Sequence, residues 1–140
     1  MRHYENLVIV KPTFTAEEIQ ASIKAVEEII TSNNGEIAAT NAMGMRKLAY
    51  PINKNERGYY HVIYYSVAPA AISEIERRFR INEDLLRFVT IKYDTNREIK
   101  AWTSFVEKAN KASEAPKAEE TPKAEEAPAT ETAATEAAAE

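Results

Sequence analysis

Between residues 59 and 67 the sequence reads Tyr59-Tyr60-His61-Val62-Ile63-Tyr64-Tyr65-Ser66-Val67. Aromatic and β-branched residues fill this stretch almost without interruption, which predicts a β-strand. A strand with one wet face alternates apolar and polar residues, whereas both faces of this one are apolar. We therefore expect both faces to be covered.

Upstream, the sequence predicts a strand and then a helix. β-forming residues run over 4–11 and stop at Pro12, which cannot continue a central ladder. Thr15-Ala16-Glu17-Glu18 matches a capping box and predicts that a helix starts there. Asn33-Asn34-Gly35 predicts its end. The apolar stripe of this helix is Ile19, Ile23, Val26 and Ile30.

Residues 36–45 predict a second strand, in which Ile37, Ala39, Asn41 and Met43 alternate with their neighbours. Residues 46–58 are dense in cations and turn formers, so we expect a long, mobile hairpin loop there.

Downstream, Pro69 suits a first helical turn, and Ile72, Ile75 and Phe79 form the apolar stripe of a second helix. Its arginines at 77, 78 and 80 alternate with glutamates, which predicts intrahelical pairing. A last strand is expected over 88–93. This order predicts an α+β, ferredoxin-like split βαββαβ fold: a four-stranded antiparallel sheet with two helices on one face and the opposite face open.

Composition divides the chain near residue 112. Residues 1–112 carry a charge of +2 and residues 113–140 a charge of −6, so the net charge of −4 conceals a slightly basic body. We expect a domain over 1–95, a helical extension over 96–112 that packs on the body or on a partner, and a disordered Ala/Glu/Pro-rich acidic tail over 113–140.

Little in the chain suits catalysis. It has no cysteine, two histidines (His3 and His61) and three glycines, so thiol chemistry is excluded and no triad, phosphate loop or metal spacing can be written. The same fold houses small acyl-phosphate hydrolases, but their glycine-rich loop is missing after the first predicted strand. We expect no catalytic residue, no metal and no cofactor. The N-terminus lacks a signal peptide, which favours a cytoplasmic protein.

RNA binding has better support. Arg57-Gly58-Tyr59-Tyr60-His61-Val62-Ile63-Tyr64 fits most of the strand-three motif of RNA-recognition modules, whose aromatic side chains stack on unpaired bases from the open sheet face. Tyr59 and His61 would hold those positions. The first strand lacks a matching aromatic platform, so we favour packing of the tyrosines on the helices or a partner protein over base stacking.

Cations supply the second indication, because clustered Lys and Arg gain from counterion release on RNA. The predicted loop over 46–58 contains four cations and Tyr50, and Glu56 is the only acidic residue in it. The cationic candidates are Arg2, Arg46, Lys47, Lys54, Arg57, Arg87 and Lys92.

Three segments resemble one family: Met1-Arg2-His3-Tyr4-Glu5, Gly44-Met45-Arg46-Lys47-Leu48-Ala49-Tyr50-Pro51-Ile52 and Gly58-Tyr59-Tyr60. From residue 1 to about 93 the chain is similar to the family of ribosomal protein six of the bacterial small subunit. The resemblance implies a structural protein of the cytoplasmic ribosome. It would bind the central domain of small-subunit ribosomal RNA as a heterodimer with ribosomal protein eighteen of that subunit.

By position, the resemblance implies that Arg2, Tyr4, Arg46, Lys47, Tyr50, Lys54 and Lys92 lie at the RNA or partner surface, without dividing them between the two. A partner protein would also explain the strand that is apolar on both faces. The alternative is a small-ligand regulatory or enzymatic domain of the same fold that dimerises through its open sheet face. That alternative predicts self-association and only weak RNA affinity.

Overall fold

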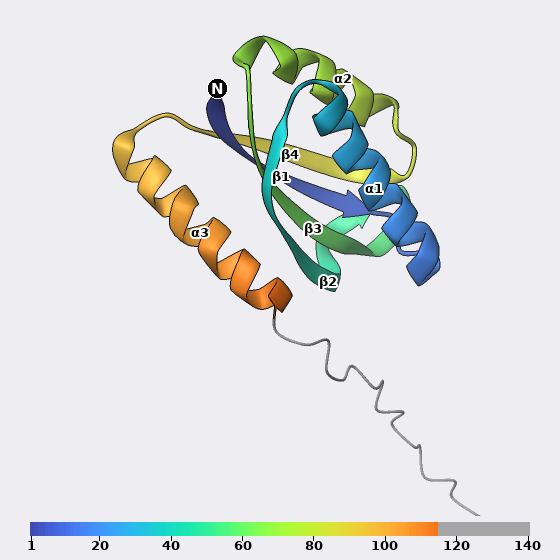
Figure 1. The fold of residues 1–140 in the computed structure, drawn as a ribbon. Coiled ribbons are helices and arrows are strands. Elements are labelled where there is room, and N and C mark those ends of the chain that lie inside the picture. The colour runs from blue at the N-terminus through green and yellow to red at the C-terminus, as the bar shows by residue number, and fades with distance from the viewer. Residues whose placement is uncertain (115–140) are drawn as a thin grey trace, which may run out of the picture.

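The computed structural model describes residues 1–114. The elements are β1 (Arg2–Val10), α1 (Ala16–Ser32), β2 (Glu36–Ile52), β3 (Asn55–Val67), η1 (Pro69–Ala71), α2 (Ile72–Ile81), β4 (Leu85–Tyr93) and α3 (Asn96–Glu114). The strands form one antiparallel sheet in the order β2-β3-β1-β4, with α1 and α2 on one side and α3 on the other (Figure 1). The predicted ferredoxin-like fold is confirmed. The predicted tail lies outside the described residues except for its first two, which end α3.

The larger apolar cluster of the described chain lies between the sheet and the α1/α2 layer. Fully burying one large apolar side chain contributes roughly 1.5–3 kcal/mol, so this layer is a main source of stability. Its buried members are Tyr4, Val8, Val26, Ile30, Ile63, Tyr65, Val67, Ile75 and Phe79.

The first helix starts where the capping box predicts. The Glu18 backbone N–H donates to Thr15 Oγ1 at 3.4 Å, and the Thr15 N–H donates to the Glu18 carboxylate at 2.7 Å. Of the predicted stripe, Ile19, Val26 and Ile30 are buried, while Ile23 is half-buried. The capping box and the stripe together explain why α1 lies on the sheet in one orientation.

The predicted alternation in β2 is wrong at its first step. The register with β3 shifts between Ile37 and Ala39, as in a β-bulge. Ile37 packs on the core beneath α1 and α2, whereas Ala39 is buried in the cluster under α3. A period of two cannot reveal an inserted residue, so the pattern placed both side chains on one face.

Residues 46–58 form the outer half of a β-hairpin, and the expectation of a mobile loop is wrong. β2 continues to Ile52, which lies opposite Asn55, while Lys47 lies opposite Arg57. Asn53 and Lys54 join the strands with φ of 48° and 65°. Two positive φ values are what a two-residue type I′ turn requires. The turn lacks the glycine that usually marks it, which is why the sequence pattern indicated a long hairpin loop and not two paired strands joined by a two-residue turn.

The second helix follows the prediction closely. Pro69 opens η1, and Ile75 and Phe79 are buried in α2. Glu74 pairs with Arg77 at 2.8 Å and with Arg78 at 3.1 Å, which lowers the pKa of this exposed carboxyl to about 2. A further pair joins Glu76 to Arg80 at 3.7 Å. The strand after it, β4, begins at Leu85 instead of Phe88.

Candidate nucleic-acid and partner interface

The sheet face that was expected to be open is partly covered by α3. A second apolar cluster, with Ala39, Val62, Tyr64, Trp102 and Ala109 as its buried members, joins this helix to β2 and β3. The doubly apolar third strand is therefore covered on its second face by a helix of the same chain, before any partner is invoked.

Specific contacts fix the position of α3. The indole N–H of Trp102 donates to the backbone carbonyl of Tyr4 at 3.1 Å, and the Trp102 ring packs on His3 with centroids 4.4 Å apart. Phe105 stacks on Tyr64 at 6.5 Å. The helix start is capped, because the Glu98 carboxylate accepts from the Thr95 N–H at 2.9 Å; this and the Asp94 N–H lower the pKa of Glu98.

The two aromatic candidates on β3 do not lie on the α3 face. Register places Tyr59 opposite Val10 and His61 opposite Val8, and directly paired residues share a face. Both valines are fully buried, and Val8 belongs to the core cluster between the sheet and the α1/α2 layer. His61 is buried as well, and burial lowers its pKa to about 4. Base stacking, the less favoured alternative for these rings, does not fit the structure, because the strand parity turns them toward the helices; packing on the helices, the favoured expectation, agrees with the register.

Tyr4 is also buried, at 3% exposed, and stacks on Tyr65 with centroids 5.8 Å apart. The resemblance placed it at a surface, but the structure places its ring in the core. Tyr4 still contributes to the α3 face, through the carbonyl that binds Trp102.

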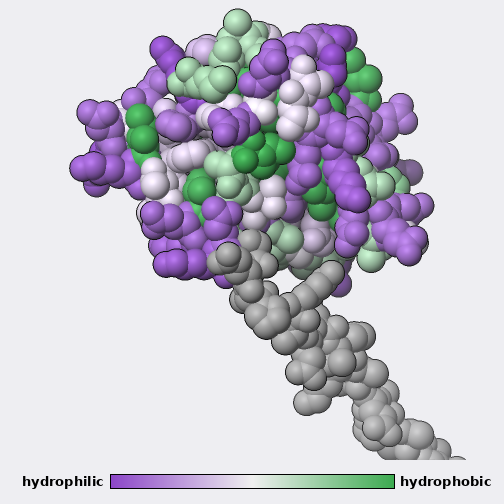
Figure 2. All heavy atoms as spheres, in the orientation of Figure 1, coloured by the Kyte–Doolittle hydropathy of each residue, from purple (hydrophilic) through white to green (hydrophobic). Residues whose placement is uncertain are grey.

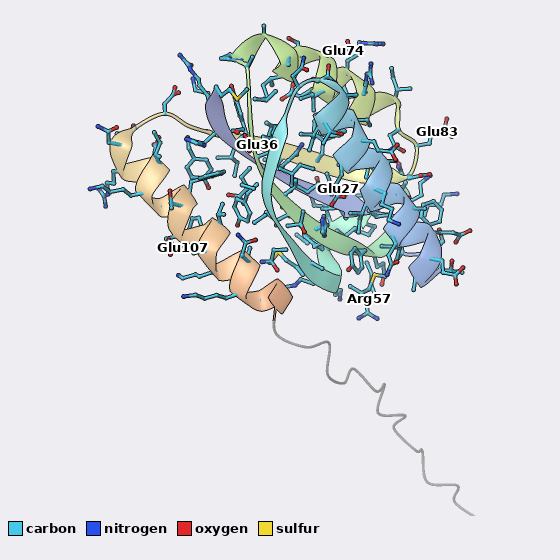
Figure 3. All side chains as sticks on the ribbon, in the orientation of Figure 1. Glu27, Glu36, Arg57, Glu74, Glu83 and Glu107 are labelled. Atoms are coloured by element: carbon cyan, nitrogen blue, oxygen red, sulfur yellow. The ribbon has the colours of Figure 1, made fainter. Side chains whose placement is uncertain are left out.

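The hairpin brings most of the cationic candidates together. We call Arg46, Lys47, Lys54, Arg57 and Arg87 the hairpin cluster; all five side chains are exposed. None of them forms an ion pair with another side chain of residues 1–114. Arg57 projects outward at the edge of the molecule in Figure 3. Exposed cations without a carboxylate partner can bind phosphates.

Tyr50 links the hairpin to the start of β4. Its ring is 54% exposed, Arg87 donates a hydrogen bond to its hydroxyl, and the guanidinium carbon lies 5.9 Å from its ring centroid. This contact joins residues 37 positions apart in sequence. It adds a cation of β4 to those of the hairpin.

The remaining two candidates lie away from the hairpin cluster. Arg2 is 3.5 Å from Asp94, and Lys92 pairs with the same carboxylate. These contacts, the Lys92 hydrogen bond first, lower the pKa of Asp94. Arg87 lies opposite Ile9 near the end of β1, whereas Arg2 is at its start. The structure thus divides the predicted set between two ends of the sheet.

An apolar strip on β4 remains uncovered. Val89 is 46% and Ile91 43% exposed, and they pair with Leu7 and Glu5 of β1. Leu7 packs in the cluster under α3, so the strip lies on the α3 face. Sequence reasoning missed it, because alternation alone did not say which face of β4 lacks a cover.

Within residues 1–114 no group of three or more histidine, aspartate or glutamate side chains is placed to hold a metal ion. No helix of this part of the chain is long and apolar enough to span a membrane. Fold and surface together define an α+β protein of the ferredoxin-like class that exposes a cationic hairpin.

Comparison with known proteins gives the family. Residues 3–92 match the family model described as Ribosomal protein S6. The chain therefore belongs to the ribosomal protein S6 family. The sequence resemblance is confirmed, as is the expectation of a structural, non-enzymatic protein of the small subunit of the cytoplasmic ribosome.

Individual relatives agree. The chain is 78% identical to small ribosomal subunit protein bS6 of Sulfurimonas denitrificans over 116 residues, which cover 83% of this chain and 85% of that protein. It is 51% identical to bS6 of a Nitratiruptor species over 113 residues, 81% of this chain and 88% of that one. The crystal structure of 30S ribosomal protein S6 from Thermotoga maritima superposes with a TM-score of 0.66 at 31% identity, covering 74% and 97% of the two chains.

Proposed function

We propose that this chain binds the central domain of small-subunit ribosomal RNA together with ribosomal protein eighteen of that subunit, and that the hairpin cluster contacts the RNA phosphates. The observation that carries the proposal is the grouping of five exposed cations on the hairpin and at Arg87, which contacts Tyr50 of the hairpin; none of the five forms an ion pair with a described side chain. Each phosphate neutralised releases counterions, so such a group favours RNA over a neutral surface.

The rigid hairpin supports this role. Arg46 and Lys47 are paired with Gly58 and Arg57 of β3, and Ile52 is paired with Asn55 at the turn, so the cations extend from a paired backbone. Cations on a rigid element lose less conformational freedom on binding than cations on a mobile loop. Tyr50, which lies on the same hairpin and contacts Arg87 of the cluster, is exposed enough to stack on an unpaired base.

The apolar strip supports a protein partner. Val89 and Ile91 lie on the α3 face of the sheet, in a part that the helix leaves exposed, and exposed apolar side chains that adjoin one another mark interaction sites. We propose that ribosomal protein eighteen binds this strip. RNA and the partner would then bind to the same sheet, and the binding of one would favour the binding of the other. The alternative of a ligand-binding enzyme is set aside by the family.

The RNA part is tested by binding the full chain to a central-domain RNA fragment, with and without protein eighteen, over a salt series. We expect cooperative binding that weakens with salt and falls at least tenfold for Arg46→Ala/Lys47→Ala, by loss of about two phosphate contacts. The matched control is Arg77→Ala/Arg80→Ala on α2, which removes the same charge from the far face. Equal losses for both double variants would refute the role of the hairpin.

The partner part is tested by co-purification and titration with protein eighteen. Val89→Ser/Ile91→Ser should weaken the heterodimer at least tenfold, because the strip loses apolar area. Ile81→Ser is the control, since Ile81 is 63% exposed at the end of α2. An unchanged heterodimer in the β4 variant would remove the partner from this strip.

A further inference from the structure

The outward side of α3 carries a row of cations. Four cationic residues of α3 are spaced three, eight and three residues apart, and this spacing places them on one face of a helix with 3.6 residues per turn. We call them the α3 stripe: Arg97, Lys100, Lys108 and Lys111. All four are exposed. Hydrophilic side chains cover this side in Figure 2, and Figure 3 shows side chains ending in nitrogen that project from α3 away from the sheet.

The opposite face of the same helix is already occupied. Trp102 and Ala109 are buried against the sheet, and Ile99 and Val106 are half-buried. Because these apolar residues are used inside the molecule, α3 cannot place them into a lipid surface while it stays docked. What it offers to a partner is the α3 stripe.

The charges of the stripe are not balanced locally. None of its members forms an ion pair with any side chain that the structure describes. Glu98 is engaged in capping the helix, and Glu107 borders the stripe without pairing. By contrast, the arginines of α2 alternate with glutamates and pair with them. A surface helix that only needs solubility mixes the two signs as α2 does.

The path of α3 connects the two separated groups of candidate cations. The helix leaves β4 beside Asp94, the partner of Arg2 and Lys92, and its far end at Ala109 and Ala112 lies against Thr40–Ala42 of β2. From there β2 continues into the hairpin at Arg46. From Arg97 to Lys111 the helix rises about 21 Å at 1.5 Å per residue, the scale of several phosphates along a backbone.

We infer that the α3 stripe is a second phosphate-binding surface for RNA, which continues the hairpin cluster around the sheet toward Arg2 and Lys92. The family model ends at residue 92, before α3 begins, so this surface is additional to the matched domain. The inference rests on the proposed function, because the RNA is the same ribosomal RNA. Docking by Trp102 holds the stripe in place, and therefore the binding depends on a helix that is already ordered.

The test compares two triple variants of the full chain by binding to the central-domain RNA fragment with protein eighteen over a salt series. Lys100→Gln/Lys108→Gln/Lys111→Gln removes three charges from the stripe. Lys24→Gln/Arg77→Gln/Arg80→Gln removes three from α1 and α2 and serves as the control. The stripe variant should lose about two to three from the slope of log affinity against log salt and at least tenfold in affinity, with the control within about threefold.

Three other outcomes overturn the inference. If the two triple variants weaken equally, only net charge matters. If the stripe variant binds like the natural chain while Arg46→Ala/Lys47→Ala does not, the proposed function stands and the stripe is not part of it. If the natural chain binds no RNA even with protein eighteen, both proposals fail. Unchanged tryptophan fluorescence in the stripe variant shows that α3 remains docked, so a loss of binding is not a loss of structure.

Discussion

Placing a charge under α3 should release this helix from the sheet. Ala109 is 3% exposed and lies in the apolar cluster with Val62, Tyr64 and Trp102. In Ala109→Glu a carboxylate would be buried among these side chains. Burying a charge without a partner costs several kcal/mol, so the docked form becomes unfavourable.

The size of the effect is limited by what docking is worth. Losing a buried aromatic side chain such as Trp102 costs roughly 3–5 kcal/mol, and its hydrogen bond to Tyr4 contributes about 1 kcal/mol net within that figure. Ordering the helix opposes these gains. A penalty of several kcal/mol is therefore comparable with the whole docking free energy. The core under α1 and α2 does not include Ala109, so we expect α3 to detach while the sheet stays folded.

The chain contains one tryptophan, so its fluorescence reports docking directly. In Ala109→Glu the emission should shift to the red under native conditions, toward that of the unfolded chain, while the urea unfolding of the remaining domain stays cooperative. Ala101→Glu makes the same change at an exposed position of α3 and should leave the emission unchanged. A native-like emission in Ala109→Glu would refute the view that this apolar face holds the helix.

Three further predictions concern stability. Burial lowers the pKa of His61 from 6.5 to about 4, so between these pH values the unfolded chain binds more protons than the folded one. The free energy of unfolding of the natural chain should therefore fall by about 2 kcal/mol through this group between pH 7 and pH 5. In urea titrations at the two pH values, His61→Leu should lack this part of the pH dependence. Gly58→Ala should lower the free energy of unfolding by about 1–3 kcal/mol in thermal or urea unfolding, because the new Cβ would lie 2.4 Å from Ile9 Cγ2. Gly44→Ala has open space around the new Cβ but a φ of +78°, so it should cost about 1–2 kcal/mol from backbone strain alone. A cost for Gly58→Ala below about 1 kcal/mol would contradict the packing argument. Lys54→Gly should stabilise the hairpin by about 0.5–1 kcal/mol, since glycine suits the φ of 65° at this position. The same variant should bind RNA more weakly, because it loses a cation. A variant that gains both stability and RNA affinity would argue against a phosphate contact at Lys54.

Local sequence signals were sufficient to predict those features that depend on residues close together in the chain. The capping box at Thr15 and Glu18 fixed the start of α1, and the glutamates of α2 predicted its ion pairs. The same spacing recurs at the start of α3, where Thr95 is followed three residues later by Glu98 and the Thr95 N–H donates to the Glu98 carboxylate.

What could not be predicted depends on contacts between distant residues. The bulge at Ile37 exchanges the faces of β2 without any change in composition. Tyr4 and His61 have residue types common at RNA surfaces, and their burial follows from the strand parity that the register with β3 sets. Both faces of β3 were correctly expected to be covered, but the sequence could not say that α3 covers one of them.

The strand order has a consequence for synthesis. β1 is made first, yet it lies between β3 and β4 and pairs with both. While a nascent chain is shorter than about 93 residues, one edge of β1 has no strand to pair with, and an unpaired apolar strand edge promotes aggregation. The chain can thus complete its sheet only when nearly all of its folded part has left the exit tunnel. Translation that stops before Leu85 would release a product with an exposed strand edge, a substrate for chaperones and proteases.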